Sequence, residues 1–306
     1  MKRAVSISIG SSKRNKTVEI SLLGETVRIE RIGTDGDLEK AAQLYRELDG
    51  QVDAFGMGGT DLGFLVDNRW YPLHSMRQIT RFVRHTPVVD GNGLKATLEP
   101  RALRALQQVT EALPRKTALI TTAVDRWGLA RAAEESGLRC TFGDLIYSLG
   151  IPLPIRSTRG VRILAAALLP LVSRLPFHWV YPVGESQEKR RPTHTRFFDR
   201  ADVILGDCHY IYRYMPENMQ GKVIITNTTT PEDVAAFRES GVRYLITTTP
   251  VLEGRSFGTN MMEAAILAAT GRKTPVDYAR PGDYFTWLNN LLDQLPFTPK
   301  VQELQP

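Results

Sequence analysis

The sequence contains little cysteine and little histidine. Its 306 residues include two cysteines, Cys140 and Cys208, and five histidines. Two cysteines so far apart along the chain form neither a disulfide framework nor a zinc-type spacing. His74 and His85 stand apart from other ligand-type side chains, so no spacing predicts a metal site. We therefore expect a protein of the reducing cytoplasm that binds no metal.

A long hydrophobic run is also missing. The longest apolar segment, residues 161–183, is interrupted by basic residues and prolines at Arg162, Pro170, Arg174, Pro176 and His178. Such a segment is too broken to span a bilayer, and we expect a buried helix followed by an irregular stretch. The alternative is an in-plane contact with a membrane. The opening residues, MKRAVSISIG, lack the apolar core of a secretory signal, so we expect no membrane partner.

A strong excess of one charge is absent too. The chain has 39 Lys and Arg against 33 Asp and Glu, a net charge of +6, and the two signs are dispersed along it. Nucleic-acid-binding proteins concentrate their positive charge in patches, so we expect no nucleic-acid partner. A small anionic or polyhydroxylated ligand suits this balance. A homodimer remains open.

What the sequence does contain is a regular alternation of short apolar strands and helices. In the first part we expect strands at residues 4–9, 27–32, 52–55 and 87–89 and helices at 37–48, 75–83 and 100–113. In the second part we expect strands at residues 118–121, 203–205, 222–226 and 244–247 and helices that start near Arg126, Pro231 and Asn260. This alternation predicts parallel sheets covered by helices on both faces.

The predicted fold class is therefore α/β, with two Rossmann-like lobes, mainly parallel sheets and a cleft between the lobes. We expect residues 1–115 to form a substrate or catalytic lobe and residues 116–272 a nucleotide-binding lobe. Residues 273–306 should form a C-terminal helix and a tail that pack back on the body. In that helix Phe285, Leu288, Leu292 and Leu295 share a face.

Loops rich in Gly, Thr and Asp follow most predicted strands, where ligands bind in parallel sheets. Small residues there let backbone amides approach a ligand. In the first lobe these loops predict substrate-binding residues Ser11, Ser12, Gly59, Thr60, Asp61 and Asn92. In the second lobe they predict cofactor-binding residues Thr226, Asn227, Thr228, Arg255 and Gly258.

Helix capping is the alternative for two of these loops. Thr230 precedes a proline and two acidic residues, and Asn260 stands three residues before Glu263, so both segments resemble capping boxes. Residues 184–196, GESQEKRRPTHTR, predict a solvated loop, with a lid over an acidic ligand or a phosphate as the alternative.

Residues 119–137, LITTAVDRWGLARAAEESG, have the pattern of a dinucleotide-binding turn from which two glycines are missing. If Gly128 is the third glycine of the fingerprint, Asp125 occupies the second position, where its carboxylate would repel a pyrophosphate. Asp144 follows the next strand at the distance expected of a ribose ligand. The turn predicts binding of NAD or NADP by Thr121, Thr122, Asp125, Gly128 and Asp144, with weakened phosphate chemistry.

Four blocks of the sequence carry a resemblance to a known group: VDAFGMGGTDLG, TPVVDGNGLKATLE, TNTTTPED and TTTPVLEGRSFGTNMMEA. Over nearly its whole length the chain resembles bacterial proteins that are named quinate 5-dehydrogenase. In true shikimate and quinate dehydrogenases an Asn-Thr-Asp-x-x-Gly stretch stands where this chain has VVDGNGLKATL. The resemblance implies that Asp90 is the catalytic aspartate and makes Lys95 the nearest counterpart of the family's lysine.

The leading hypothesis is an NAD(P)-dependent oxidoreductase that acts on a polar, hydroxylated, quinate- or shikimate-like molecule. Asp90, aided by Lys95, would exchange the proton of the substrate hydroxyl, unless Asp90 only stabilises a turn. If the strand at 203–205 continues, Asp207 and His209 share a face and could form an acid–base pair at the substrate. The alternative is a non-redox sensor or transferase that binds a nucleotide, a sugar or a phosphorylated metabolite in the cleft.

Overall fold

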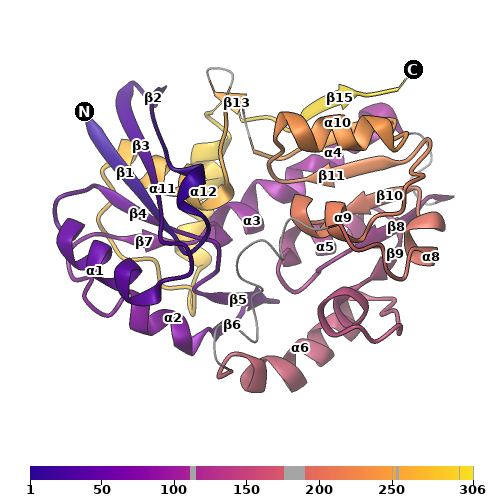
Figure 1. Cartoon of the computed structure of the whole chain (residues 1–306), viewed down its shortest axis with the longest axis horizontal. Coiled ribbons are helices and arrows are strands. Elements are labelled where there is room, and N and C mark those ends of the chain that lie inside the picture. Colours follow the sequence, from indigo (N-terminus) through magenta and orange to yellow (C-terminus); the bar gives the residue numbers. More distant parts are fainter. Residues whose placement is uncertain (111–114, 176–189, 250, 253–254, 296, 306) are drawn as a thin grey trace. The chain divides into compact units, whose positions relative to one another are not determined.

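The computed structural model describes residues 1–110, 115–175, 190–249, 251–252, 255–295 and 297–305, and of residues 251, 252, 255 and 256 it describes the backbone alone. The chain forms two compact units (Figure 1). Unit 1 comprises Met1–Leu94, Leu168–Ser186 and Leu252–Leu295. Unit 2 comprises Lys95–Ala167, Gln187–Val251 and Pro296–Pro306. Both units contain parallel strands and helices, which confirms the α/β, two-lobed fold class.

Unit 1 is built on a five-stranded sheet in the order β2-β3-β1-β4-β7. Its strands are β1 (Lys2–Ser8), β2 (Lys16–Leu22), β3 (Glu25–Gly33), β4 (Ala54–Gly58) and β7 (Val88–Val89). Strand β1 is parallel to β3 and β4, and β4 is parallel to β7. Strand β2 runs antiparallel to β3. The hairpin of β5 (Gly63–Val66) and β6 (Arg69–Pro72) lies outside this sheet.

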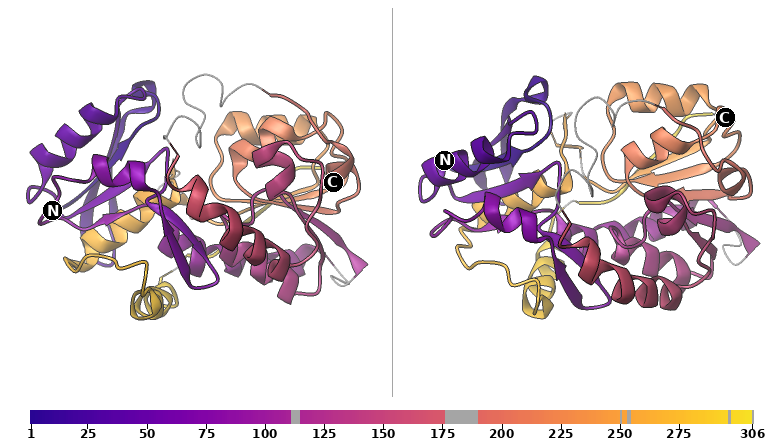
Figure 2. Two further views of the ribbon diagram at one scale, coloured as in Figure 1. Left: turned by 90° about the horizontal axis from the view of Figure 1, so that it is seen from below. Right: turned by 60° about the horizontal axis from the view of Figure 1, so that its bottom comes forward.

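Helices cover both faces of the unit 1 sheet. Successive side chains of β1 point to opposite faces, because the side-chain period of a strand is two. On one face Val5 and Ile7 pack in a core with Ala41 and Tyr45 of α1 (Leu38–Leu48) and with α2 (His74–Ile79). On the other face α11 (Thr259–Thr270) contacts β1, β3 and β4, and Figure 2 shows this helix beside the first strands.

Unit 2 is built on a six-stranded sheet in the order β15-β12-β11-β10-β8-β9. The strands are β8 (Thr117–Ile120), β9 (Arg139–Phe142), β10 (Val203–Leu205), β11 (Val223–Thr226), β12 (Tyr244–Thr247) and β15 (Lys300–Glu303). All pairs are parallel except β12 with β15. The helices are η2 (Glu99–Arg101), α4 (Ala102–Val109), α5 (Trp127–Glu135), η4 (Asp144–Ser148), α8 (Arg196–Asp199), α9 (Cys208–Tyr214) and α10 (Pro231–Glu239).

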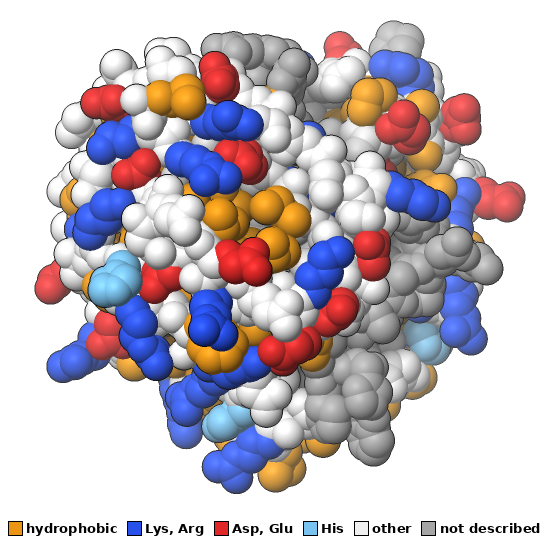
Figure 3. All heavy atoms as spheres, turned by 60° about the vertical axis from the view of Figure 1, so that its left-hand side comes forward, with side chains coloured by type: hydrophobic (Ala, Val, Ile, Leu, Met, Phe, Trp, Pro, Cys, Tyr) orange, Lys and Arg blue, Asp and Glu red, His pale blue; other side chains and the backbone are white. Residues whose placement is uncertain are grey.

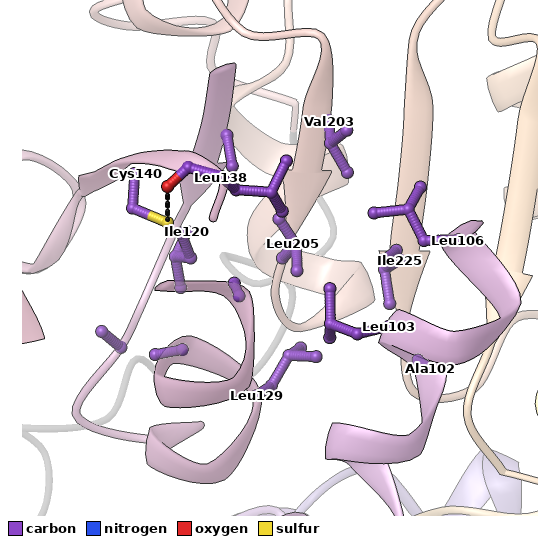
Figure 4. Close-up of a cluster of buried hydrophobic side chains, with 14 of the residues drawn as sticks. Ala102, Leu103, Leu106, Ile120, Leu129, Leu138, Cys140, Val203, Leu205 and Ile225 are labelled. Carbon is purple, nitrogen blue, oxygen red and sulfur yellow. Dashed lines mark hydrogen bonds between the residues drawn. The ribbon is translucent and has the colours of Figure 1, made fainter. Parts of the chain in front are cut away.

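Two buried clusters fill the two faces of this sheet. Figure 4 shows Leu103 and Leu106 of α4 directed toward Leu205 and Ile225 of the sheet. The second cluster contains Phe198 and Phe237 together with apolar residues of α9. Burial of these clusters is the main force that holds unit 2 together, because apolar area removed from water contributes about 25 cal/mol per Å².

Four segments connect or extend the units. Helix α3 (Asn92–Thr97) runs from unit 1 into unit 2, and α6 (Thr158–Val172) runs from unit 2 into unit 1. Strands β13 (Val251–Leu252) and β14 (Arg255–Ser256) form a two-stranded sheet. In α12 (Gly282–Leu292) the buried residues are Tyr284, Leu288 and Leu292, so Tyr284 takes the place that we expected for Phe285.

Most predicted strands and helices lie within a few residues of the observed ones, but the segment boundaries do not coincide with the units. We expected residues 252–272 in the second lobe, and they belong to unit 1. The reason is α11, whose residues are buried nearly all round and pack on β1 and β4. Strand β2 was missed because its basic start resembled an exposed loop, although its residues alternate between exposed and buried.

Candidate functional site

The strand order of unit 2 reverses between β8 and β10. From β8 the chain continues to β9 on one side, and from β10 it continues to β11 on the other. Ligands of open α/β sheets bind outside the carboxyl ends of two such strands. Gly206 follows β10 with φ +154°, and a Cβ there would lie 2.0 Å from Thr121 Oγ1 after β8. Only glycine therefore allows the two strand ends to approach so closely.

We expect Gly206→Ala to lower the free energy of unfolding by about 2 kcal/mol, since it combines an unfavourable φ with a steric overlap. Gly221 is the matched control in the same unit: its φ is +73°, and a Cβ there would meet nothing within 4 Å. Gly221→Ala should cost about 1 kcal/mol, from backbone conformation alone. Urea denaturation of both variants measures the difference, and equal losses would contradict the close approach at Thr121.

Five charged side chains gather at this edge of the unit 2 sheet, and we call them the Arg126 cluster: Lys95, Glu99, Asp125, Arg126 and Asp207. Arg126, the residue before α5, donates from Nη1 to Glu99 and from Nη2 to Asp207 Oδ2, the latter at 2.8 Å. Lys95 Nζ donates to Asp125 Oδ1 at 2.7 Å. Arg126 Nε lies 3.5 Å from Asp125 Oδ2. One buried guanidinium thus fixes three carboxylates.

Burial divides the Arg126 cluster into an inner and an outer part. The side chains of Arg126 and Glu99 are 3% and 1% exposed, whereas those of Asp125 and Asp207 are 23% and 21% exposed. Asp207 is further held by Asn227, whose Nδ2 lies 3.1 Å from Asp207 Oδ2. The two outer carboxylates can therefore meet a ligand, while the inner ion pair positions them.

Burial and the neighbouring charges shift the pKa values of Glu99 and Asp207. Burial raises the pKa of Glu99 to about 7, although Arg126 and Lys95 act in the opposite direction. For Asp207 burial would raise the pKa as well, but Arg126 and His209 outweigh it and the pKa is lowered. Asp207 is therefore ionised at neutral pH, whereas the raised pKa of Glu99 lies close to it.

The strand on which the predicted acid–base pair of Asp207 and His209 depended does not reach these residues. Strand β10 ends at Leu205, and Asp207 is the N-cap of α9, with Oδ1 accepting from the His209 amide at 2.9 Å. The His209 side chain is exposed. The other carboxylate oxygen of Asp207 accepts from Arg126. Side chains alternate between two faces only along a strand, and here the chain has already turned into a helix.

Amides of the predicted dinucleotide turn already donate to a carboxylate of the protein. Asp144 Oδ1 accepts from the Val124 amide at 2.9 Å, and the Ala123 amide also donates to this carboxylate. Amides of this turn are the groups that would approach a pyrophosphate. Burial raises the pKa of Asp144 to about 6, against the amides that lower it. Asp144, the first residue of η4, is thus buried and accepts hydrogen bonds from this turn.

Asp125 and Gly128 also differ from their predicted roles. Asp125 is neutralised by Lys95 instead of facing a phosphate. A Cβ at Gly128 would lie 2.6 Å from the Lys95 carbonyl oxygen. This glycine therefore allows close packing of α5 against α3, whereas the third glycine of the fingerprint allows close packing of a helix against a strand. With its amides bound to Asp144 and its carboxylates nearby, the turn does not fit NAD or NADP in the usual pose.

Hydroxyl groups line the strand ends of unit 2. Thr226 Oγ1 donates to Asn227 Oδ1 at 3.1 Å, and Thr228 Oγ1 lies 2.8 Å from Thr249 Oγ1. Among the described residues, the buried hydroxyls of Thr122 and Thr248 have no hydrogen-bond partner. The predicted residues Thr121, Thr122, Thr226, Asn227 and Thr228 therefore do lie along one sheet edge.

Asp90 of unit 1 accepts hydrogen bonds from its neighbours. Its Oδ2 accepts from the Leu62 amide at 2.7 Å and from Asn92 Nδ2 at 2.7 Å, and its Oδ1 accepts from the Asn92 amide at 3.0 Å. The side chain is buried. Lys95, the expected aid to Asp90, belongs to unit 2 and pairs with Asp125. These contacts are those of a turn residue, the alternative role that the sequence left open for Asp90.

Glu263 is a buried acid that the sequence did not single out as a site residue. Its Oε1 accepts from Tyr284 at 2.7 Å and Tyr278 at 3.2 Å, and its Oε2 accepts from the Leu94 amide at 3.1 Å. The expected capping box of Asn260 and Glu263 is wrong, because α11 starts at Thr259 with Gly258 as its N-cap. The capping box at Thr230 is confirmed.

The remaining predicted residues of unit 1 lie at strand ends. Ser11 Oγ accepts from the Lys13 amide in the cap of η1 (Ser12–Arg14), and the Ser12 amide donates to Asp35. Gly59, Thr60 and Asp61 directly follow β4. The side chain of Arg255 and residues 184–189 of the predicted loop lie outside the described residues.

Three further observations limit the kinds of site. In the described part of the chain, no group of His, Cys, Asp and Glu side chains has the arrangement of a metal site. None of the described helices has the length and apolarity needed to cross a membrane. On the face seen in Figure 3, Lys and Arg side chains are interspersed with Asp and Glu, and they do not merge into one basic patch.

Comparison with known proteins gives a family but no activity. The family described as Domain of unknown function (DUF8754) matches residues 93–304, and Domain of unknown function (DUF8753) matches residues 3–90. No curated protein matches the chain. The two matched segments meet beside the boundary between Leu94 and Lys95 that separates units 1 and 2 in the structure.

Solved structures similar to this chain have low identity. An NAD-dependent malic enzyme from Thermotoga maritima is 14% identical, with 90% of this chain and 73% of that chain covered, at a TM-score of 0.38. A glutamate dehydrogenase from Thermus thermophilus is 14% identical, with 95% and 74% covered, at 0.41. A glucose-galactose binding protein from Geobacillus stearothermophilus is 12% identical, with 99% and 97% covered, at 0.38.

Proposed function

We propose a function for this chain, which belongs to the family described as Domain of unknown function (DUF8754), from the geometry of unit 2. The carboxyl edge of its sheet binds a small, uncharged, polyhydroxylated group such as that of a sugar or a cyclic polyol. The observation that carries the proposal is the pair of partly exposed carboxylates, Asp125 and Asp207, held by the buried Arg126. Carboxylates fixed in this way accept hydrogen bonds from neighbouring hydroxyls of a ligand.

The charges of this edge favour hydroxyls over phosphates. Lys95 and Arg126 are its cations, and Asp125 and Asp207 balance them, with Glu99 and Asp144 as further acids. A phosphate would add negative charge beside these carboxylates at a cost that rises as water is excluded. The threonine hydroxyls after the strands supply further donors and acceptors to a polyol.

We expect Asp207→Asn and Asp125→Asn to weaken binding of such a ligand by roughly 10-fold each, the scale of one charge-assisted hydrogen bond. Titration calorimetry with a panel of neutral hexoses and neutral cyclic polyols measures this effect. Glu135→Gln is the matched control in unit 2, because Glu135 is 61% exposed and pairs with Arg131 on the surface of α5.

Melting curves without ligand separate binding from folding in these variants. If no sugar or polyol binds the wild type, or if both variants bind as tightly as the control, the carboxylates have no role in recognition and the proposal fails. Tight binding of NAD or NADP in place of sugars would favour the second candidate below.

The second candidate is the NAD(P)-dependent oxidoreductase for a quinate- or shikimate-like substrate that the resemblance implies. The Lys95–Asp125 pair favours it, because a lysine of 8% exposure bound to a partly exposed carboxylate at 2.7 Å could exchange a proton with a substrate hydroxyl. The dinucleotide turn does not fit the cofactor in its usual pose. Formation of reduced nicotinamide by the wild type, and its loss in Lys95→Met with substrate binding retained, would support this candidate over the first.

A further inference from the structure

Arg31 of unit 1 is a half-buried cation whose guanidinium donates to neutral acceptors. Its Nη1 donates to the Ser11 carbonyl at 2.9 Å, and its Nη2 donates to Ser8 Oγ at 2.9 Å. Within the described residues no carboxylate oxygen forms an ion pair with its guanidinium. Burial and the nearby positive charge of Arg14 lower the pKa of Arg31, with Asp35 acting against them. Charges that proteins bury are normally paired with an opposite charge, whereas Arg31 is held by a carbonyl and a hydroxyl.

The side chain of Arg31 shares a sheet face with the start of α11. In the parallel register of β1 and β3, Arg31 is the partner of Ser6. Ser6 Oγ accepts from Asn260 Nδ2 at 2.8 Å, which places the first turn of α11 on this face. Helix α11 has 12 residues, and its N-cap Gly258 provides no side-chain acceptor for the first amides. Such amides and the helix dipole favour an anion.

Glycines let Arg31, Ser8 and Asn260 pack closely against the ends of two strands. A Cβ at Gly10 would lie 3.2 Å from Arg31 Nη2, and a Cβ at Gly58 would lie 2.9 Å from Ser8 Cβ and 3.2 Å from Asn260 Nδ2. Gly10 follows β1, and Gly58 is the last residue of β4, the neighbouring strand. After β1 the chain continues to one side of the sheet, and after β4 it continues to the other side. The carboxyl ends of such strands are where open α/β sheets bind ligands.

We infer that Arg31, Ser8 and the first turn of α11 form a binding site for an oxyanion, the phosphate or carboxylate group of a small molecule. The guanidinium N–H groups that are not used by Ser8 and Ser11 present a fork that matches either group. Ser8 Oγ and the uncapped amides supply neutral donors beside it. The inference rests on unit 1 alone and is independent of the function proposed for unit 2.

The test is a titration of the full chain with inorganic phosphate and, in a second arm, with acetate, at constant ionic strength held with chloride. We expect phosphate or acetate to raise the melting temperature of the wild type. Arg31→Met, which keeps much of the side-chain volume and removes the charge, should weaken that ligand by roughly 10-fold or more. The stronger of the two arms identifies the ligand group.

Arg28→Met is the matched control, because Arg28 lies on the same strand, points to the opposite face and pairs with Glu30. It should respond to the anion as the wild type does. The melting temperature without anion shows how much stability Arg31→Met loses with its hydrogen bonds to Ser8 and Ser11. An equal anion response in both variants, or no response in the wild type, would overturn the inference.

Discussion

Replacement of Arg126 by methionine should lower the free energy of unfolding by about 3–5 kcal/mol, the usual cost of removing one partner from a buried ion pair. Arg126 and Glu99 are almost completely buried, and the same guanidinium also binds Asp207. Without the cation, Glu99 must either remain charged in an apolar environment or take up a proton. Urea denaturation near neutral pH measures the loss.

A second substitution separates the ion pair from simple packing. In the double variant Arg126→Met with Glu99→Met the buried acid is gone as well, so part of the stability should return, with an interaction energy of about 1–3 kcal/mol. Arg131→Met is the control on α5, where the side chain is 55% exposed, and it should change stability by less than about 1 kcal/mol. Additive losses in the double variant would show that the Arg126 cluster does not depend on this pair.

Substitution of Glu263 by glutamine should make unit 1 less sensitive to pH. Burial, followed by the charge of Asp90, raises the pKa of Glu263 to about 7 from an ordinary 4.5, although the tyrosines and the Leu94 amide lower it. A group whose pKa is higher in the folded state stabilises the fold below its unfolded pKa, and this contribution is lost as the pH rises through the folded pKa. The window is therefore pH 4.5 to about 7.

Across this window the wild type should lose about 3 kcal/mol relative to Glu263→Gln. Glutamine can accept from the Leu94 amide and donate to the hydroxyl oxygens of Tyr278 and Tyr284, so it can satisfy the same three partners. Denaturation curves from pH 4.5 to 8 give the difference. Glu39→Gln, at an exposed glutamate of the same unit, is the control. Parallel curves for the wild type and Glu263→Gln would contradict a protonated Glu263.

Glu99 should likewise make unit 2 less stable as the pH rises, because burial raises its pKa to about 7 as well. The two acids have different consequences for function. Glu263 is surrounded by tyrosines and an amide in the interior of unit 1, whereas Glu99 supports the guanidinium that fixes the exposed carboxylates Asp125 and Asp207. A change of pH near 7 is thus expected to reach the proposed ligand site through Glu99.

Much of the secondary structure could be predicted from the sequence because its signals are local. The apolar runs at β10 and β12 and the cap of α10 at Thr230 were predicted where they occur. The alternation of strands and helices also predicted the parallel α/β class and placed polar loops at the strand ends. These signals depend on near neighbours in the chain, which is why a single sequence was sufficient.

The partners of the charged side chains were decided by the tertiary structure. Lys95 was expected beside Asp90 because the two are close in sequence, yet it pairs with Asp125, 30 residues away. The neighbouring residues gave no sign that Arg126 would form this cluster, because its partner Asp207 follows another strand of the sheet.

The binding role of the turn after β8 also depends on contacts with residues distant in sequence. Its sequence indicated a weakened dinucleotide site, but its amides are bound by Asp144 from the end of β9. A buried amide or carboxylate must find a partner, and the chain supplies whichever group the sheet brings near. The sequence therefore determined which edges of the two sheets are polar, and only the packing of the strands decided which groups there are already occupied and which remain for a ligand.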